Sequence, residues 1–75
     1  MRTLRNIAFE ISTDWVNISN YALPYLNAMS ELESIDDEYG FDSGQSIVLY
    51  FLSNATTWRG ETARRIKKEL KSLCN

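Results

Sequence analysis

Apolar residues recur along the first part of the chain at the spacing of one helical face. From Leu4 they fall at positions 4, 7, 8, 11 and 15. Residues three and four apart share a face of a helix, whereas the residues of one face of a strand are two apart. The pattern predicts a first helix over residues 3–16, with the Thr3 side chain as its N-terminal cap.

A second amphipathic pattern follows, and it contains Pro24, the single proline of the chain. Proline is tolerated in the first turn of a helix, where its missing N–H has no partner in any case. We therefore expect a helix that is capped by Ser19 or Asn20 and ends near Ser34, before a charged turn. Its predicted buried face consists of Ala22, Tyr25, Leu26, Met29 and Leu32.

The most apolar segment of the chain, IVLYFL, occupies residues 47–52. Asp42 followed by Gln45 resembles a capping box before it, with Asp in place of Ser or Thr. This predicts a helix over residues 43–55 that is apolar on nearly all sides and lies at the centre of the fold. A strand over residues 47–52 is the alternative, but no second strand is evident to pair with its backbone.

The C-terminal segment, TTWRGETARRIKKELKSL at 56–73, predicts a strongly amphipathic helix that is capped by Thr56 or Thr57. Its apolar stripe consists of Ala63, Ile66, Leu70, Leu73 and Cys74. One flank carries the basic strip, which we define as Arg64, Lys67, Lys68 and Lys71. On the other flank Glu61, Arg65 and Glu69 alternate in charge at intervals of four, which is typical of solvent-exposed pairs along one helix.

These patterns together predict an all-α fold, a small compact bundle of three to four helices that forms a single helical domain over residues 1–75. A hydrophobic fraction of 44% provides enough apolar material for a packed core in so short a chain. The charge is divided unevenly, because residues 1–58 carry eight acidic and two basic side chains whereas residues 59–75 carry six basic and two acidic ones. Acidic groups crowd into residues 31–42, the acidic segment, whose simplest interpretation is a solvated turn.

Most chemical functions lack their usual residues in this chain. There is no histidine to act as a general base near neutral pH, and the single cysteine, Cys74, lies next to the C-terminus without a base beside it. The acidic segment does not follow the template of a calcium loop, and zinc-binding clusters are missing. We therefore expect no enzymatic activity, no metal, no cofactor and no membrane span, and a reducing, intracellular location.

The start of the last helix has two interpretations. In the first, Trp58 folds over the end of the preceding helix and Gly60 permits close packing there. In the second, Trp58 and Arg59 are exposed anchors, because Trp and Arg are frequent at binding hot spots. The basic strip is likewise either a solvated face, a contact for an acidic protein, or a track for phosphates, although a sequence pI near 4.9 disfavours nucleic acid.

Several segments resemble a family of small uncharacterised proteins encoded in tailed-phage and prophage genomes. They are DW at 14–15, YALPYLNAM at 21–29, YGFDS at 39–43 and SIVLYFLSNATTWRGETARRIKKELKSL at 46–73. The resemblance covers most of the chain. It implies an early or accessory phage product in the cytoplasm of a bacterial host, and it supplies no catalytic motif.

We therefore expect a non-enzymatic accessory protein that binds a host or phage protein. The genomic context suggests inhibition of a host defence, for example of the CRISPR type, or of a replication factor; this is an argument by analogy. The expected partner-binding residues are Trp58, Arg59, Arg64, Lys67, Lys68 and Lys71. The alternatives are a nucleic-acid-associated protein that uses the basic strip, contact through the acidic segment, and a homo-oligomer.

Overall fold

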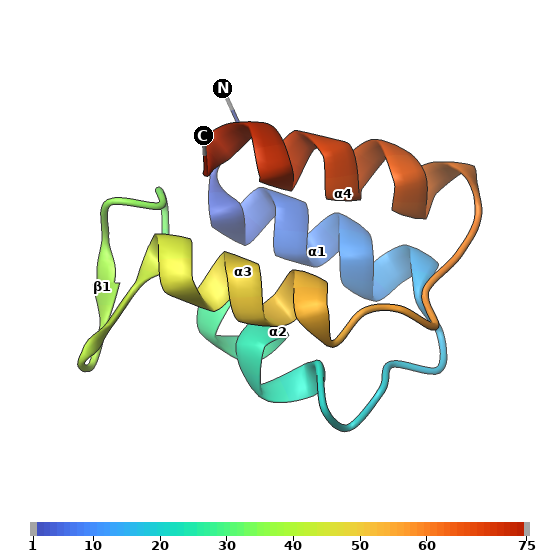
Figure 1. The fold of residues 1–75 in the computed structure, drawn as a ribbon, viewed down its shortest axis with the longest axis horizontal. Coiled ribbons are helices and arrows are strands. Elements are labelled where there is room, and N and C mark those ends of the chain that lie inside the picture. The colour runs from blue at the N-terminus through green and yellow to red at the C-terminus, as the bar shows by residue number, and fades with distance from the viewer. Residues whose placement is uncertain (1, 75) are drawn as a thin grey trace.

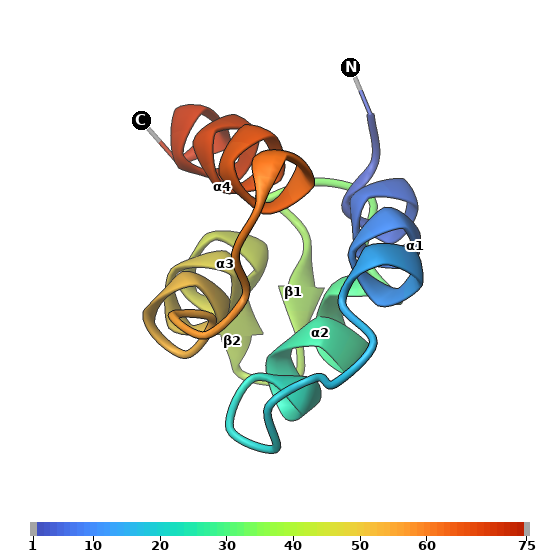
Figure 2. The ribbon, with the colours of Figure 1, turned by 90° about the vertical axis from the view of Figure 1, so that its right-hand side faces the viewer.

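Four helices surround one hydrophobic core in the computed structural model, which describes residues 2–74 (Figures 1 and 2). They are α1 (Leu4–Asp14), α2 (Leu23–Met29), α3 (Gly44–Ser53) and α4 (Glu61–Leu73). α1 packs on α2 and α4, and α3 also packs on α2 and α4, so that the contacts form a closed ring. α1 and α4 lie side by side and run in opposite directions (Figure 1). The prediction of a small, mainly helical bundle is confirmed.

The core draws apolar side chains from all four helices and from the loops between them. Ile47, Val48 and Phe51 of α3 are buried, as predicted, whereas Leu52, which was predicted at the centre with them, is only partly buried. α3 is not buried on all sides, however, because Leu49 and Tyr50 are 46% and 50% exposed. The other core residues are Leu4, Ile7, Ala8, Ile11, Trp15, Ala22, Leu26, Ala28, Met29, Leu32, Ala55, Trp58, Ala63, Ile66 and Leu70.

The caps of three helices show how closely their first residues were predicted. The Thr3 hydroxyl accepts a hydrogen bond from the Asn6 N–H at 3.0 Å, which confirms the predicted cap of α1. α3 is capped by Ser43 rather than by Asp42, because the Ser43 hydroxyl reaches the Ser46 N–H. α4 begins after Gly60, with no side-chain cap, so Thr56 and Thr57 are not its caps.

Gly60 is required by its backbone conformation rather than by close packing. Its φ angle is +113°, a value that residues with a side chain rarely adopt. A Cβ atom placed at this position would meet no atom within 4 Å. The interpretation that Gly60 allows two helices to approach closely is therefore wrong.

α2 is shorter than predicted at both ends. It begins after Ala22, with Pro24 in its first turn as expected, while Ser19 forms a separate turn by accepting a hydrogen bond from the Tyr21 N–H. It ends at Met29 rather than near residue 34. The chain beyond it presents its carbonyl groups to the open N-terminus of α1, where the Leu4 N–H donates to Glu33 and the Arg5 N–H to Leu32, both at 2.9 Å. These bonds satisfy two helix-start donors that would otherwise lack partners.

A two-stranded hairpin, which the sequence pattern did not predict, lies between α2 and α3. β1 (Glu38–Tyr39) pairs in antiparallel fashion with β2 (Asp42–Ser43), and Tyr39 lies opposite Asp42. The two-residue loop begins with Gly40, whose φ angle of +65° suits a tight hairpin turn. The hairpin extends away from the helices beside the start of α3 (Figure 1).

Candidate interaction surfaces

Trp58, which was considered as an exposed anchor, lies inside the molecule. Only 2% of it is exposed. Its ring stacks on Trp15 with a centroid distance of 5.6 Å and an angle of 11° between the planes. Phe51 meets both indole rings edge-on, at 6.2 Å from Trp15 and 6.4 Å from Trp58. These three residues form the aromatic cluster, and the interpretation in which Trp58 folds over the end of α3 is the one that the structure supports.

The polar groups of Trp58 have partners within the chain, among them the backbone N–H, which donates to the carbonyl of Ala55. The indole Nε1–H donates to Oδ2 of Asp14 at 2.9 Å, which joins the loop before α4 to the end of α1. The backbone carbonyl accepts a hydrogen bond from Nζ of Lys67 at 2.7 Å, and the same ammonium lies 5.9 Å from the centre of the indole ring. Burial lowers the pKa of Lys67, and the nearby charges of Lys71 and Arg59 lower it further. Lys67 therefore has a structural role, because its ammonium group binds Trp58.

The remaining predicted contact residues stay on the surface. Arg59 is exposed in the loop just before α4, and Arg64, Lys68 and Lys71 are exposed along the helix. Within residues 2–74 none of these four side chains takes part in a salt bridge. Three cations of the basic strip thus have no ionic partner in the described part of the chain. Arg64 and Lys68 line a shallow hollow together with Glu61, Thr62 and Arg65.

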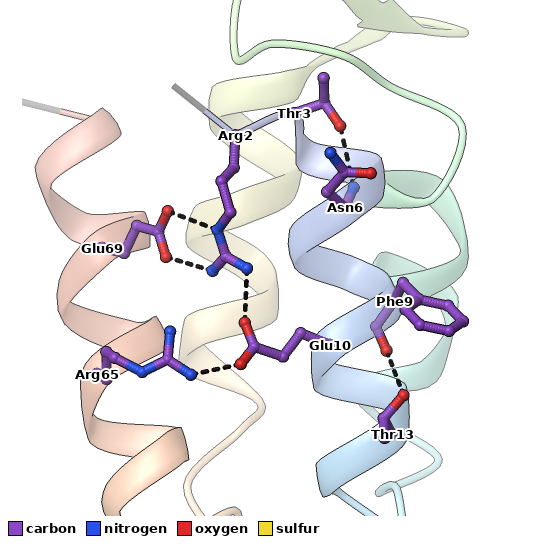
Figure 3. A network of polar contacts seen from close by, with 8 residues as sticks. All are labelled: Arg2, Thr3, Asn6, Phe9, Glu10, Thr13, Arg65 and Glu69. Carbon is purple, nitrogen blue, oxygen red and sulfur yellow. Dashed lines mark hydrogen bonds and ion pairs between the residues drawn. The ribbon is translucent and has the colours of Figure 1, made fainter.

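The other flank of α4 binds α1 rather than forming pairs along its own helix. Arg2 is the centre of this network: it donates to Glu10 at 2.6 Å and, through two nitrogens, to Glu69 (Figure 3). Glu10 also accepts a hydrogen bond from Arg65. The predicted pairing of Glu61, Arg65 and Glu69 is therefore wrong, because the charges on this flank hold α1 and α4 together.

The network makes the stability of the protein depend on pH. Hydrogen bonds from Arg65 and then Arg2 lower the pKa of Glu10 below its usual value. A carboxylate with a lowered folded-state pKa stabilises the fold above its unfolded pKa, and this contribution disappears as the pH falls through the folded value. We expect Glu10→Gln to be less stable than the wild type at pH 7 and the difference to shrink below about pH 4. Urea unfolding across pH 3–7 would measure this.

Glu31→Gln is the matched control, because Glu31 is exposed and takes no part in a salt bridge within residues 2–74. Its stability difference from the wild type should be small at every pH. A difference for Glu10→Gln that stayed constant down to pH 3 would contradict the role of the Glu10 charge.

The most exposed apolar side chain is Phe41, at the tip of the hairpin. Its relative exposure is 108%, compared with 75% for Phe9, which points outward from α1 on the side away from the ionic network (Figure 3). Phe41 is absent from the predicted contact residues. The signal that would have found it is the pair Gly40-Phe41, which fits the loop of a two-residue hairpin and leaves the second side chain with nothing to pack against.

An aromatic pair also reaches the surface between α2 and α3. The rings of Tyr25 and Tyr50 lie 5.4 Å apart, with Tyr50 half exposed. Other large exposed apolar residues are Val16, Tyr21, Leu23, Tyr39 and Leu49. Exposed aromatic rings of this kind are enriched where proteins bind other proteins.

In residues 2–74 every buried side chain is apolar, and no group of three or more His, Cys, Asp or Glu side chains is placed to hold a metal ion. Cys74 is half buried against the core, and burial raises the pKa of its thiol, which disfavours the reactive thiolate. None of the helices described is long and apolar enough to cross a membrane.

Comparison of the chain with protein-family models, with curated protein sequences and with solved structures gives no match.

Proposed function

We propose that the chain is a small, non-enzymatic, phage-type accessory protein that acts by binding a host or phage protein in the bacterial cytoplasm. The observation that carries this proposal is the fully exposed Phe41 at the tip of a hairpin that extends from the helices. Leaving an aromatic side chain in water gives up the free energy of its burial. A partner that covers Phe41 would recover this free energy.

The charges and the core favour binding over catalysis. Catalytic acids and bases usually have pKa values that are shifted by burial and by neighbouring groups. In residues 2–74 the clear shifts belong to Arg2, Glu10, Lys67 and Cys74. The first two belong to the network between α1 and α4, Lys67 is bonded to Trp58, and Cys74 packs against the core. Each of these groups has a structural role.

The phage context supports the further proposal that binding inhibits the partner, either a host defence of the CRISPR type or a replication factor. This part rests on the resemblance to phage proteins and on analogy. A protein with one packed core and exposed aromatic side chains can inhibit a larger protein simply by occupying its functional surface.

The second candidate function is association with nucleic acid through Arg64, Lys68 and Lys71. The observation in its favour is that these three cations are exposed and take part in no salt bridge within residues 2–74. Trp58, an aromatic side chain near them in the sequence, is buried and offers no face on which a base could stack. Three phosphate contacts without a stacking platform provide a modest electrostatic attraction that salt weakens.

Affinity capture from a bacterial lysate, read out by mass spectrometry, tests the first candidate. The wild type should retain a specific protein, and the charge reversal Arg64→Glu/Lys68→Glu/Lys71→Glu should report whether α4 contributes to the contact. A mobility-shift assay tests the second candidate. If the wild type shifts DNA or RNA at about 0.15 M salt and the reversed variant does not, the nucleic-acid function is supported in place of protein binding.

A further inference from the structure

The hairpin presents an aromatic ring in a strongly acidic setting. Phe41 forms the tip, and the strands on either side contribute the carboxylates of Glu38 and Asp42, both exposed. Along the chain, residues 6–58 contain eight acidic side chains and no basic one. The carboxylates of Glu38 and Asp42 make the immediate surroundings of Phe41 negative, and a partner that covers the ring has to offer an apolar pocket with a basic rim.

Hydrogen bonds join the segment before the hairpin to the first turn of α3. The Gly44 N–H donates to the carbonyl of Asp37 at 2.7 Å, and the Gln45 N–H donates to Ile35 at 3.0 Å. The Asp37 carboxylate accepts hydrogen bonds from the N–H groups of Glu33 and Ser34. Phe41 thus stands on an anchored support, and a contact residue that is already positioned loses less conformational entropy on binding.

An apolar or aromatic surface beside a row of basic side chains is characteristic of proteins that bind single-stranded nucleic acid. Such proteins stack bases on aromatic rings and hold the phosphates with Lys and Arg. The hairpin resembles the nucleic acid in two respects. Its aromatic ring takes the place of a base, and its carboxylates take the place of phosphates. On this ground we propose that the hairpin of residues 38–43 inserts Phe41 into the single-stranded nucleic-acid site of a protein partner and competes with the nucleic acid.

A second copy of this chain fits the hairpin less well. The hollow beside the basic strip is lined by Glu61, Thr62, Arg64, Arg65 and Lys68, and none of these provides an aromatic platform. Trp58, the aromatic residue nearest to the strip in the sequence, is buried. The hollow beside the basic strip therefore offers positive charge to the hairpin but no aromatic side chain on which Phe41 could stack.

The proposal rests on the proposed function and is tested with a defined protein fraction. A nuclease-treated bacterial lysate is separated on single-stranded DNA cellulose, and the salt-eluted fraction is passed over the immobilised wild-type chain. The retained protein is purified, and its dissociation constant for the labelled chain is measured at about 0.15 M salt with and without an excess of a thymidine oligonucleotide. We expect the oligonucleotide to displace the chain.

Matched variants locate the contact. Phe41→Ala should weaken binding at least about 30-fold, as expected for a central aromatic anchor. Phe9→Ala removes the same side chain from another exposed position and should change the dissociation constant less than about 2-fold. Glu38→Gln/Asp42→Asn should slow association and make it less sensitive to salt, while the charge-matched control Glu31→Gln/Glu61→Gln should not.

The outcomes distinguish a failure of the hairpin proposal from a failure of the proposed protein-binding function. A retained protein that binds Phe41→Ala as tightly as the wild type, or that keeps the chain in the presence of the oligonucleotide, overturns the hairpin proposal and leaves protein binding intact. The flow-through of the cellulose column is passed over the immobilised chain in the same way. If neither this flow-through nor the salt-eluted fraction contains a partner, both proposals fail. Concentration-dependent self-association that Phe41→Ala abolishes would assign the hairpin to a second copy instead. Circular dichroism of each variant confirms that folding is unchanged.

Discussion

Replacing Trp58 by Ala is expected to reduce the free energy of unfolding by about 3–5 kcal/mol, the range for removing a buried aromatic side chain. Three interactions disappear together: the stacking on Trp15, the edge contact with Phe51 and the hydrogen bond to Asp14. A domain of 75 residues has only a small stability margin. We therefore expect the variant to be largely unfolded at 37 °C, as measured by far-ultraviolet circular dichroism and thermal unfolding.

Two milder variants separate packing from hydrogen bonding at this position. Trp58→Phe keeps an aromatic ring but removes the indole N–H, and Asp14→Ala removes its acceptor. The hydrogen bond is expected to contribute about 1 kcal/mol to the free energy of unfolding. The two side chains are coupled if the double variant Trp58→Phe/Asp14→Ala loses less stability than the sum of the two single losses. A Trp58→Ala variant that melts within a few degrees of the wild type would show that the aromatic cluster is not central to the core.

The helical pattern of the chain was predictable because local spacing determines it. The apolar positions of α1 and their cap at Thr3 were identified correctly, and so were the three central residues of α3. The early end of α2 was not predictable, because it depends on hydrogen bonds between distant segments. The carbonyl groups of Leu32 and Glu33 complete the N-terminus of α1, about 28 residues away in sequence.

The candidate site was predicted only in part, for a similar reason. Arg59, Arg64, Lys68 and Lys71 are exposed, as their helical positions suggest. Helical spacing places Lys67 beside them, but it does not show that the backbone carbonyl of Trp58 lies within reach of its ammonium. The same spacing predicts pairs along the opposite flank, whereas Arg65 and Glu69 bind Glu10 of α1 and Arg2, which precedes α1.

The fate of Trp58 also depended on a distant contact. A tryptophan next to an arginine at a helix start is compatible with an exposed anchor or with a core residue. Trp15, 43 positions earlier, decides between them, because its stacked ring covers the face of Trp58. No feature within residues 56–61 contains this information.

The hairpin was missed because its strands are too short to give an alternating pattern. Each strand has two residues, and most of their side chains are exposed, so no buried positions alternate with exposed ones. Hairpins of this size are not stable alone. In this one, hydrogen bonds join the two sides at its base, because Asp37 and Ile35 before β1 accept from Gly44 and Gln45 at the start of α3.

The substitution Gly44→Ala tests that anchorage. A Cβ atom at Gly44 would lie 2.7 Å from the carbonyl oxygen of Ser34 and 2.9 Å from the Cα atom of Ile35. Both neighbours are backbone atoms, so the clash can be relieved only by moving the segment that supports the hairpin. We expect a loss of about 1–3 kcal/mol in the free energy of unfolding, measured by urea denaturation.

Gly40→Ala is the comparison that separates anchorage from turn geometry. A Cβ atom at Gly40 would meet nothing within 4 Å, and only the positive φ angle of 65° opposes it. That strain costs about 1 kcal/mol and is confined to the hairpin tip. If Gly44→Ala proved no more destabilising than Gly40→Ala, the close contact at the base would not matter. If it is more destabilising, Gly44→Ala should also weaken partner binding even though Phe41 is unchanged, because the ring would then stand on a displaced support.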